Sequence, residues 1–241
     1  TLRVVLYVFG PKLARECGGA TILAWMAVAT ILISSLIALK KDNLKARLAF
    51  STIGQLSYIV LGIAILSPLS TAGALYHLVA HAFMKITLFM CAGAIFVTTH
   101  KKDISEMVGL GRRMPVTMSA FTIASLGIAG FPFFVGFVSK ANIIMGALKT
   151  GQLLFGATLI VSAVLALTYL MPVVLIAFKR EPVNPEFNAY GEASKTMLAP
   201  LLITATVSVI LGVAPNFGLH LLDLAISTGE AVFARAGGVI C

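Results

Sequence analysis

The sequence predicts an all-α protein, a polytopic bundle of transmembrane helices. Apolar residues make up 59% of the 241 positions and charged residues only 11%, whereas an ordinary soluble domain has about 25% charged residues. The mean hydropathy is +1.00. Several apolar runs reach the roughly 20 residues that a helix needs to cross a hydrocarbon core. A lipid bilayer is therefore the expected main solvent.

The basic residues are distributed as in a membrane protein. The net charge is +9, but almost all of the 18 Lys and Arg stand in short connectors between apolar runs rather than along one polar face. This pattern is typical of cytoplasmic connectors, so we expect the bilayer, and no nucleic acid, as a partner. The cysteines are far apart and lack metal-ligand spacing, which argues against a disulfide framework or a zinc site: Cys17, Cys91 and Cys241.

The spans can be taken in chain order. Residues 1–9 look like the end of a helix, which Gly10-Pro11 would terminate before a charged connector with Lys12, Arg15 and Glu16. Five full spans follow, each bounded by proline, glycine or charge: 19–39, 46–66, 74–98, 152–178 and 197–215.

Segment 115–148 is too long for one straight span and carries helix breakers in its middle. Proline removes a backbone donor and clashes with the preceding turn, and glycine loosens what remains. We therefore expect a break near 130–136, caused by Gly127, Gly130, Pro132 and Gly136.

The basic connectors decide how often this segment crosses the membrane. Connectors 40–47, 99–114 and 179–196 should share the cytoplasmic side. The third joins the first two only if 115–148 crosses once, as a broken helix, and 152–178 returns. The prediction is about six spans plus a partial first helix.

The C-terminal segment differs in pattern. Residues 217–236 mix apolar side chains with polar and charged ones, which predicts an amphipathic helix lying along the membrane surface rather than another span. We therefore divide the chain into a transmembrane bundle, 1–216, and a surface helix with its tail, 217–241.

Two lysines fall inside the predicted spans. Lys85 lies near the midpoint of 74–98, and Lys140 follows the expected break. No Asp or Glu lies deep in any predicted span, so neither lysine has an acidic partner in this chain. A charge at the bilayer centre costs about 2.5–3.5 kcal/mol. Such a lysine should face the bundle interior, where an amine that is costly to keep charged can both gain and release a proton.

Polar residues recur at i, i+4 and i+8 up to Lys85. His77, His81 and Lys85 should form one stripe, with about 6 Å of axial rise between neighbours. Imidazoles that titrate near neutral pH, followed by a buried amine, can form a water-bridged proton wire. The alternative is a stripe that only bonds neighbouring helices. For the three residues together we favour proton transfer, because intramembrane charge is costly.

The break itself suggests a second polar site, at Ser139 and Lys140. Broken helices expose unpaired backbone groups, which are tolerated at membrane depth only where protein or a water-filled cavity satisfies them. The alternative is a packing kink with Lys140 snorkelling to the surface.

A third cluster opens the span 46–66. Lys45 stands in the basic connector, and Ser51, Thr52, Gln55 and Tyr58 follow on the helix. From physical reasoning alone, Lys45 is better described as an interfacial anchor than as a proton relay. The hydroxyls could simply bond between helices.

Three segments together resemble a known family. Asp42 to Gln55, His77 to Lys85 and Gly136 to Lys140 are similar, in order and spacing, to the antiporter-like proton-translocating subunits of respiratory complex I, membrane-bound hydrogenases and Mrp-type cation/proton antiporters. The resemblance extends from the first residues to about Lys179.

The resemblance implies a set of proton-pathway residues. In that family the lysine of D-x-x-K-x-R-L-A, the polar residues of H-x-x-x-H-A-F-x-K and the lysine after the broken helix line a central hydrophilic axis. In this sequence they correspond to Lys45, His77, His81, Lys85 and Lys140. Lys85 would be the central relay and Lys140 the exit-side or terminal relay. Some members carry glutamate at the position of Lys140, so this chain resembles a lysine-type member.

The resemblance also implies that the chain is a C-terminal half. The family usually has about fourteen helices in two inverted repeats, each with a broken helix. The earlier half normally contributes a glutamate and lysine pair, which we therefore expect to lie outside this sequence.

The expected function is proton translocation by one subunit of a multisubunit complex in a prokaryotic cytoplasmic (inner) membrane. The first choice is an Mrp-type monovalent cation (Na⁺)/proton antiporter. The close alternative is a proton-pumping subunit of an NADH-quinone oxidoreductase or membrane-bound hydrogenase, and a non-conducting structural subunit is a third. Expected partners are other membrane subunits, protons and Na⁺. The sequence has no Walker loop, dinucleotide fingerprint, nucleophile elbow or H-E-x-x-H site, so we expect neither cofactor nor catalytic chemistry in this chain.

Overall fold

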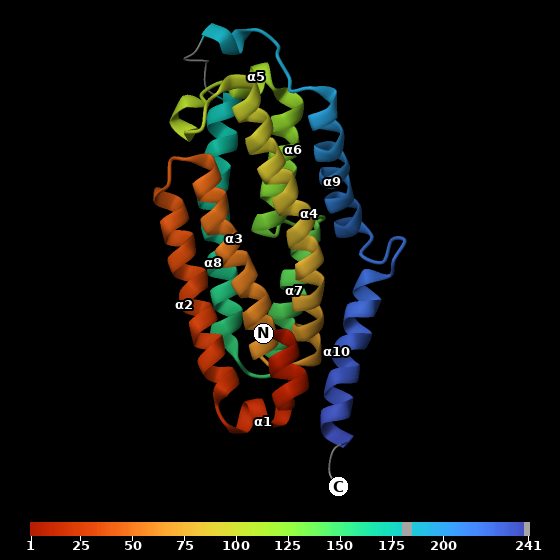
Figure 1. Cartoon of the computed structure of the whole chain (residues 1–241). Helices are drawn as coiled ribbons and strands as arrows, with labels where there is room; N and C mark the ends of the chain where they lie inside the picture. The colour runs from red at the N-terminus through yellow and green to blue at the C-terminus, as the bar shows by residue number, and fades with distance from the viewer. Residues whose placement is uncertain (180–184, 239–241) are drawn as a thin grey trace.

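The computed structural model describes residues 1–179 and 185–238, which form a bundle of helices (Figure 1). The only β pairing in this described part is an isolated bridge between Asn43 and Asp103. The elements are η1 (Val4–Phe9), α1 (Gly10–Glu16), α2 (Gly19–Lys40), α3 (Leu44–Ala64), α4 (Pro68–Thr99), η2 (Ile104–Glu106), α5 (Leu110–Arg113), α6 (Pro115–Ala129), α7 (Val135–Lys149), α8 (Leu153–Lys179), η3 (Pro185–Asn188), α9 (Lys195–Val213) and α10 (Leu221–Gly238).

The predicted spans correspond to real helices. Among the described residues, five helices are long and apolar enough to cross a membrane, namely α2, α3, α4, α8 and α9. They coincide with the five predicted full spans, so the polytopic all-α bundle is confirmed. Helix α4 begins at Pro68 rather than near 74, because Ser67 and Ser70 form a reciprocal capping box and Pro68 occupies the first helical turn.

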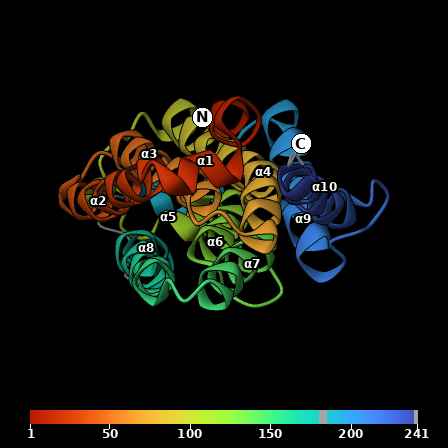
Figure 2. The ribbon, with the colours of Figure 1, turned by 90° about the horizontal axis from the view of Figure 1, so that it is seen from below.

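Helix α4 is the central helix of the bundle. It packs against α3, α6, α7, α9 and α10. Viewed along the bundle, α2 and α10 lie at opposite outer ends of an elongated cross-section, with α4 between them (Figure 2). The polar stripe predicted on this helix is therefore surrounded by protein.

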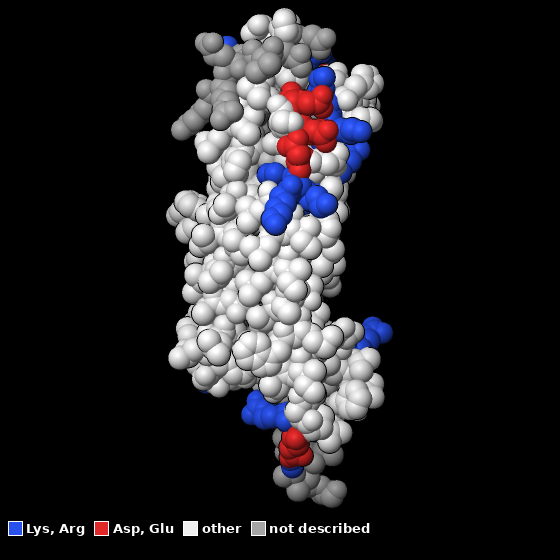
Figure 3. Space-filling view, turned by 90° about the vertical axis from the view of Figure 1, so that its left-hand side faces the viewer, with Lys and Arg blue, Asp and Glu red and all other residues white. Residues whose placement is uncertain are grey.

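The three basic connectors meet at one end of the bundle, the upper end in Figure 1. Backbone hydrogen bonds join the first to the second, from Leu44 N to the Lys102 carbonyl at 2.9 Å, and the second to the third, from Gly191 N to the Arg113 carbonyl at 3.0 Å. Charged side chains gather at this end, above a broad uncharged band (Figure 3). Residues 180–184 of the third connector lie outside the described residues. The assignment of this end to the cytoplasm stays a prediction.

Segment 115–148 is broken where the sequence predicts. Helix α6 ends at Ala129 and α7 begins at Val135, and the two halves follow one another along the bundle as a single crossing (Figure 1). Gly130 has φ 84°, a left-handed conformation that glycine adopts without steric cost. A side chain at Gly136 would overlap the carbonyl of Gly127, so this position must be glycine for the two halves to pack closely.

Two terminal regions differ from expectation. The predicted charged connector after Gly10 is largely helical, because Pro11 starts the short helix α1. Helix α10 was expected along the membrane surface, but its axis follows the bundle beside the lower part of α4 (Figure 1). The physical reason is a close approach at Gly229, where a side chain would meet the carbonyl of Pro68. The domain boundary at 216 stays a prediction.

Candidate functional site

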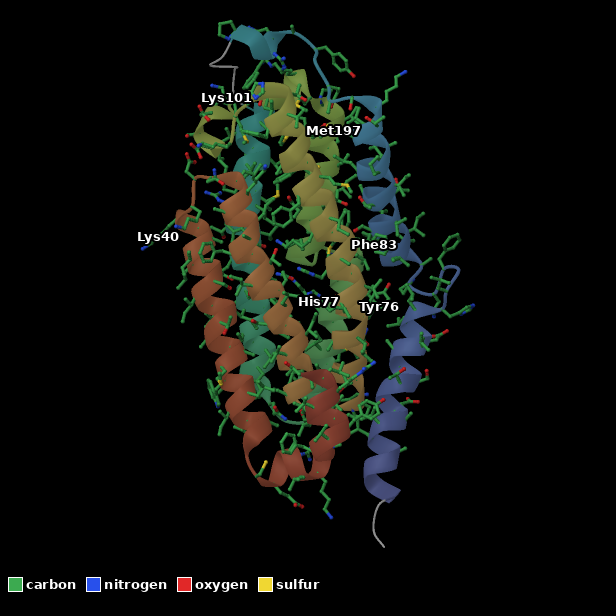
Figure 4. All side chains as sticks on the ribbon, viewed as in Figure 1. Lys40, Tyr76, His77, Phe83, Lys101 and Met197 are labelled. Carbon is green, nitrogen blue, oxygen red and sulfur yellow. The ribbon has the colours of Figure 1, made fainter. Side chains whose placement is uncertain are left out.

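The polar stripe of α4 is buried as predicted. The relative exposure is 0% for His77, 8% for His81 and 4% for Lys85. The ring centroids of His77 and His81 are 6.3 Å apart, about one helical turn. Figure 4 shows His77 near the middle of the bundle, far from Lys101 at the upper end. The stripe therefore lies at membrane depth, inside the protein.

Lys85 is bound by oxygens from α3. Its Nζ donates to Ser51 Oγ at 2.7 Å and to the Leu48 carbonyl at 3.2 Å. Ser51 Oγ is in turn 2.8 Å from the hydroxyl of Tyr169 on α8. A buried donor without partners is costly, and the Ser51 and Leu48 oxygens compensate that cost without a carboxylate.

His77 is held by the second half of the broken helix. Its Nδ1 is 2.8 Å from Ser139 Oγ, which donates to the Gly136 carbonyl at 3.0 Å. Because the hydroxyl has one proton, that bond leaves Ser139 as acceptor and makes Nδ1 the donor. The Nε2 atom of a neutral His77 then carries a free lone pair. It has no hydrogen-bond partner among the described residues.

The side chain of Lys140, on α7, lies against the C-terminal end of α6. Its Nζ donates to the Ile128 carbonyl at 2.5 Å, a group that the break leaves without a helical partner. A cation at a helix C-terminus is also favoured by the helix dipole. The Lys140 side chain is 4% exposed, so the alternative in which it snorkels to the surface does not match the structure.

Tyr58 lies between His77 and Lys140. Its ring stacks on His77 with centroids 5.5 Å apart and planes inclined by 20°. Lys140 Nζ stands 4.8 Å from the centroid of the same ring, within the range of a cation–π contact. Tyr58 thus joins the stripe on α4 to the lysine at the helix break.

Several buried polar atoms along this line keep unused hydrogen-bonding capacity. Gln55 Oε1 and the Nε2 atoms of His77 and His81 have no partner among the described residues. Buried polar atoms usually find protein or water partners. These atoms can therefore accept a hydrogen bond from water, and the imidazole nitrogens can also accept a proton.

Lys45 does not join the buried group. Its side chain is exposed at the start of α3, with Nζ 4.8 Å from the Phe96 ring centroid. Thr52 also stands apart, since its hydroxyl donates to the Leu48 carbonyl of its own helix at 2.9 Å. The other residues predicted on α3, Ser51, Gln55 and Tyr58, are buried.

Two polar residues of the site were missed by sequence reasoning. Arg47 is 9% exposed and donates to the Tyr169 and Lys41 carbonyls, both at 2.8 Å. Helical spacing could have revealed Arg47, because Ser51 follows at i+4 and Gln55 at i+8. Tyr169 could not have been found this way, since it is an isolated tyrosine in an apolar span.

The site contains cations and neutral polar groups only. No Asp or Glu is among the buried residues of the described part, and that part holds no group of three His, Cys, Asp or Glu side chains able to bind a metal. The arrangement can carry protons between amines, imidazoles and hydroxyls.

The fold and the site together define a class, that of polytopic membrane proteins with a line of buried basic residues beside a broken helix. Residues 6–168 match the family described as NADH:quinone oxidoreductase/Mrp antiporter, TM. The chain belongs to this family, which confirms the resemblance drawn from its motifs.

Individual relatives and solved structures show what the chain is similar to. It is 36% identical over 202 residues, 79% of this chain and 40% of the relative, to NADH-quinone oxidoreductase subunit N of Desulforudis audaxviator. Its fold resembles a chain of the Mrp complex from Dietzia, with TM-score 0.80, 24% identity and 90% of this chain covering 49% of that one. It also resembles a chain of respiratory complex I from Thermus thermophilus with bound NADH, with TM-score 0.81, 22% identity and 95% covering 49%. The chain thus spans less than half the length of these proteins.

Proposed function

We propose that this chain passes protons along Lys140, His77, His81 and Lys85, with Lys45 at the basic mouth of the pathway. The observation that carries the proposal is the pair of buried lysines whose hydrogen bonds go only to neutral oxygens, joined through Tyr58 and two imidazoles. An ammonium that lacks a carboxylate inside a membrane protein is costly. Each lysine can therefore hand its proton to a neighbouring neutral group.

The contacts suggest which step of proton transfer each group performs. Lys85 donates to the Ser51 hydroxyl, which contacts the Tyr169 hydroxyl, and this pair can relay a proton away from Lys85. Arg47 holds the Tyr169 backbone carbonyl in place and keeps its own proton. Lys140 meets the freed Ile128 carbonyl and the Tyr58 ring, which hold the ammonium without neutralising it. His77 and His81 lie between the lysines, and each neutral imidazole can accept a proton at one nitrogen and release it at the other.

The chain acts within a larger complex under this proposal. The named relatives are subunits of multisubunit membrane complexes, so other membrane subunits are the proposed partners. The bacterial origin of these relatives supports a prokaryotic cytoplasmic membrane.

Two kinds of complex remain to be distinguished. An Mrp-type antiporter would exchange Na⁺ for protons, and a redox complex would couple proton movement to electron transfer in other subunits. The fold resembles both kinds about equally. The 36% identity to an NADH-quinone oxidoreductase subunit favours the redox complex. Identification of the subunits that co-purify with the chain separates them, because flavin and iron–sulfur subunits occur only in the second.

Reconstitution of the complex in liposomes tests the proposal. Lys85→Ala and Lys140→Ala should each slow proton movement by roughly a hundredfold, the usual effect of removing a group that transfers protons. Lys149→Ala is the matched control, since Lys149 is exposed at the end of α7. If complexes that assemble normally with Lys85→Ala and Lys140→Ala moved protons at the parental rate, the chain would instead be a structural subunit.

A further inference from the structure

A pocket of about 210 Å³ lies at the basic end of α3 and α4, apart from the buried site. Three lysines and several apolar side chains line it, among them Lys45, Lys101, Lys102, Leu44, Phe96 and Met107. The pocket stands where α3 begins and α4 ends, at the end of the bundle where the basic connectors meet. It therefore lies at the level where the headgroups of a bilayer would begin.

Three acidic side chains beside the pocket already have partners, and one of them, Glu106, pairs with the pocket lysine Lys101. Their oxygens contact other groups of the connectors: Asp42 with Ser105 Oγ at 2.6 Å, Asp103 with Asn43 Nδ2 at 3.2 Å and Glu106 with Lys101 Nζ at 3.4 Å. Lys45 and Lys102 form no ion pair among the described residues. The pocket thus keeps an excess of positive charge.

Apolar surface continues from the pocket along both helices. On α3, Ile53 and Leu56 are exposed and follow Lys45 at i+8 and i+11, so they lie on the same face of the helix. On α4, Phe89 is exposed one heptad before Phe96. A ligand whose charged head lies in the pocket can therefore extend an apolar tail along this face.

We propose that this pocket binds the phosphate of an anionic phospholipid, with Lys45 and Lys102 as its principal cations. Basic pockets between transmembrane helices on the cytoplasmic side bind such headgroups, and the basic connectors predict that side for this end of the bundle. The apolar stripes favour a lipid over free phosphate. This binding requires no proton transfer, so it can be tested independently of the proposed function.

The test measures lipid retention by the intact complex that contains the full-length chain. The complex is placed in phosphatidylcholine nanodiscs that contain phosphatidylglycerol, and bound lipid is then quantified by native mass spectrometry. Lys45→Gln/Lys102→Gln should weaken phosphatidylglycerol binding by roughly twenty-five-fold, from about fivefold per lysine. Lys102→Gln alone, at an exposed position, should weaken phosphatidylglycerol binding by about fivefold. Lys40→Gln/Lys41→Gln removes the same charge from the same end but outside the pocket, and should retain parental binding.

Three results would overturn the inference. Equal loss of phosphatidylglycerol in the pocket variant and the control variant would indicate a general surface charge effect. Inorganic phosphate that displaces the lipid and binds equally well would indicate a phosphate site. A photo-cross-linker at position 102 should label lipid, and labelling of another protein subunit instead would mean that a protein covers the pocket.

Discussion

The two buried lysines lie in the same bundle but are stabilised by different means. Lys85 projects from a continuous helix and is held by the Ser51 hydroxyl, which also contacts Tyr169, and by the Leu48 carbonyl of α3. Lys140 follows a break and is held by a backbone carbonyl, that of Ile128, together with the Tyr58 ring. A carbonyl inside a continuous helix already accepts a helical hydrogen bond, so Lys85 shares the Leu48 carbonyl of α3 at 3.2 Å and makes its shorter bond, of 2.7 Å, to the Ser51 hydroxyl. A broken helix supplies an unshared carbonyl from its own end, and the sequence then needs only the glycines that permit the break.

The largest effect is expected from closing the gap at the break. Gly136→Ala places a methyl group against the Gly127 carbonyl and should destabilise the protein by about 3 kcal/mol, near the upper end for overpacking. The loss would appear as a lower thermal unfolding temperature of the detergent-solubilised complex. Because Lys85 does not depend on the break, hydrogen exchange should increase in α6 and α7 but not in α3.

Gly93→Ala is the matched control for this variant. A methyl group at Gly93 meets open space, and stability should change by no more than about 1 kcal/mol. Equal destabilisation by the two substitutions would show that the close approach at Gly136 does not govern the Lys140 region.

The Ser51 and Tyr169 hydroxyls should be energetically coupled if they hold Lys85 together. Ser51→Ala leaves Lys85 and Tyr169 without a shared partner and should cost about 1–3 kcal/mol. In a double-mutant cycle with Tyr169→Phe, the two changes should be non-additive by at least about 0.5 kcal/mol. Ser51→Ala combined with Ser139→Ala shares no partner and should be additive, as measured by thermal or denaturant unfolding. Additivity in both cycles would contradict a continuous hydroxyl chain at Lys85.

A smaller change in stability is expected when the aromatic ring of Tyr58 beside Lys140 is removed. Tyr58→Phe keeps the ring and removes a buried hydroxyl that contacts the Leu159 carbonyl at 3.5 Å and the Ser162 and Gln55 side chains, so its effect measures the hydroxyl alone. Tyr58→Leu removes the cation–π contact and should cost about 2 kcal/mol beyond the effect of Tyr58→Phe. The same unfolding measurements apply, and equal stability of the two variants would mean that the ring does not hold Lys140.

Much of the fold follows from local sequence signals. Long apolar runs gave the spans, and Gly130 with Pro132 gave the break, because both depend on neighbouring residues only. The orientation of α10 did not follow, since it depends on contact between Gly229 and a helix start far away in the sequence. The start of α4 was misplaced because the apolar run conceals the capping signal of Ser67 and Ser70.

The candidate site was predicted in part. His77, His81 and Lys85 share one helical face, and that face is buried, as periodicity indicated. Lys45 was grouped with them through the family motif, although the buried face of α3 passes through Arg47. Tyr169 comes from another helix, and no spacing within its own span indicates which hydroxyl it meets.

Chemical rescue at Lys140 tests the central claim most directly, because it asks whether an amine carries protons at this position. A cleft of about 350 Å³ between α7 and α8 reaches Lys140 and gives a small amine access to the space left by Lys140→Ala. We predict that Lys140→Ala complexes in liposomes lose roughly a hundredfold in proton movement and recover part of it with methylamine but not with a neutral alcohol of similar size. Parental proton movement without amine, or no response to methylamine in a complex that assembles normally, would contradict the account.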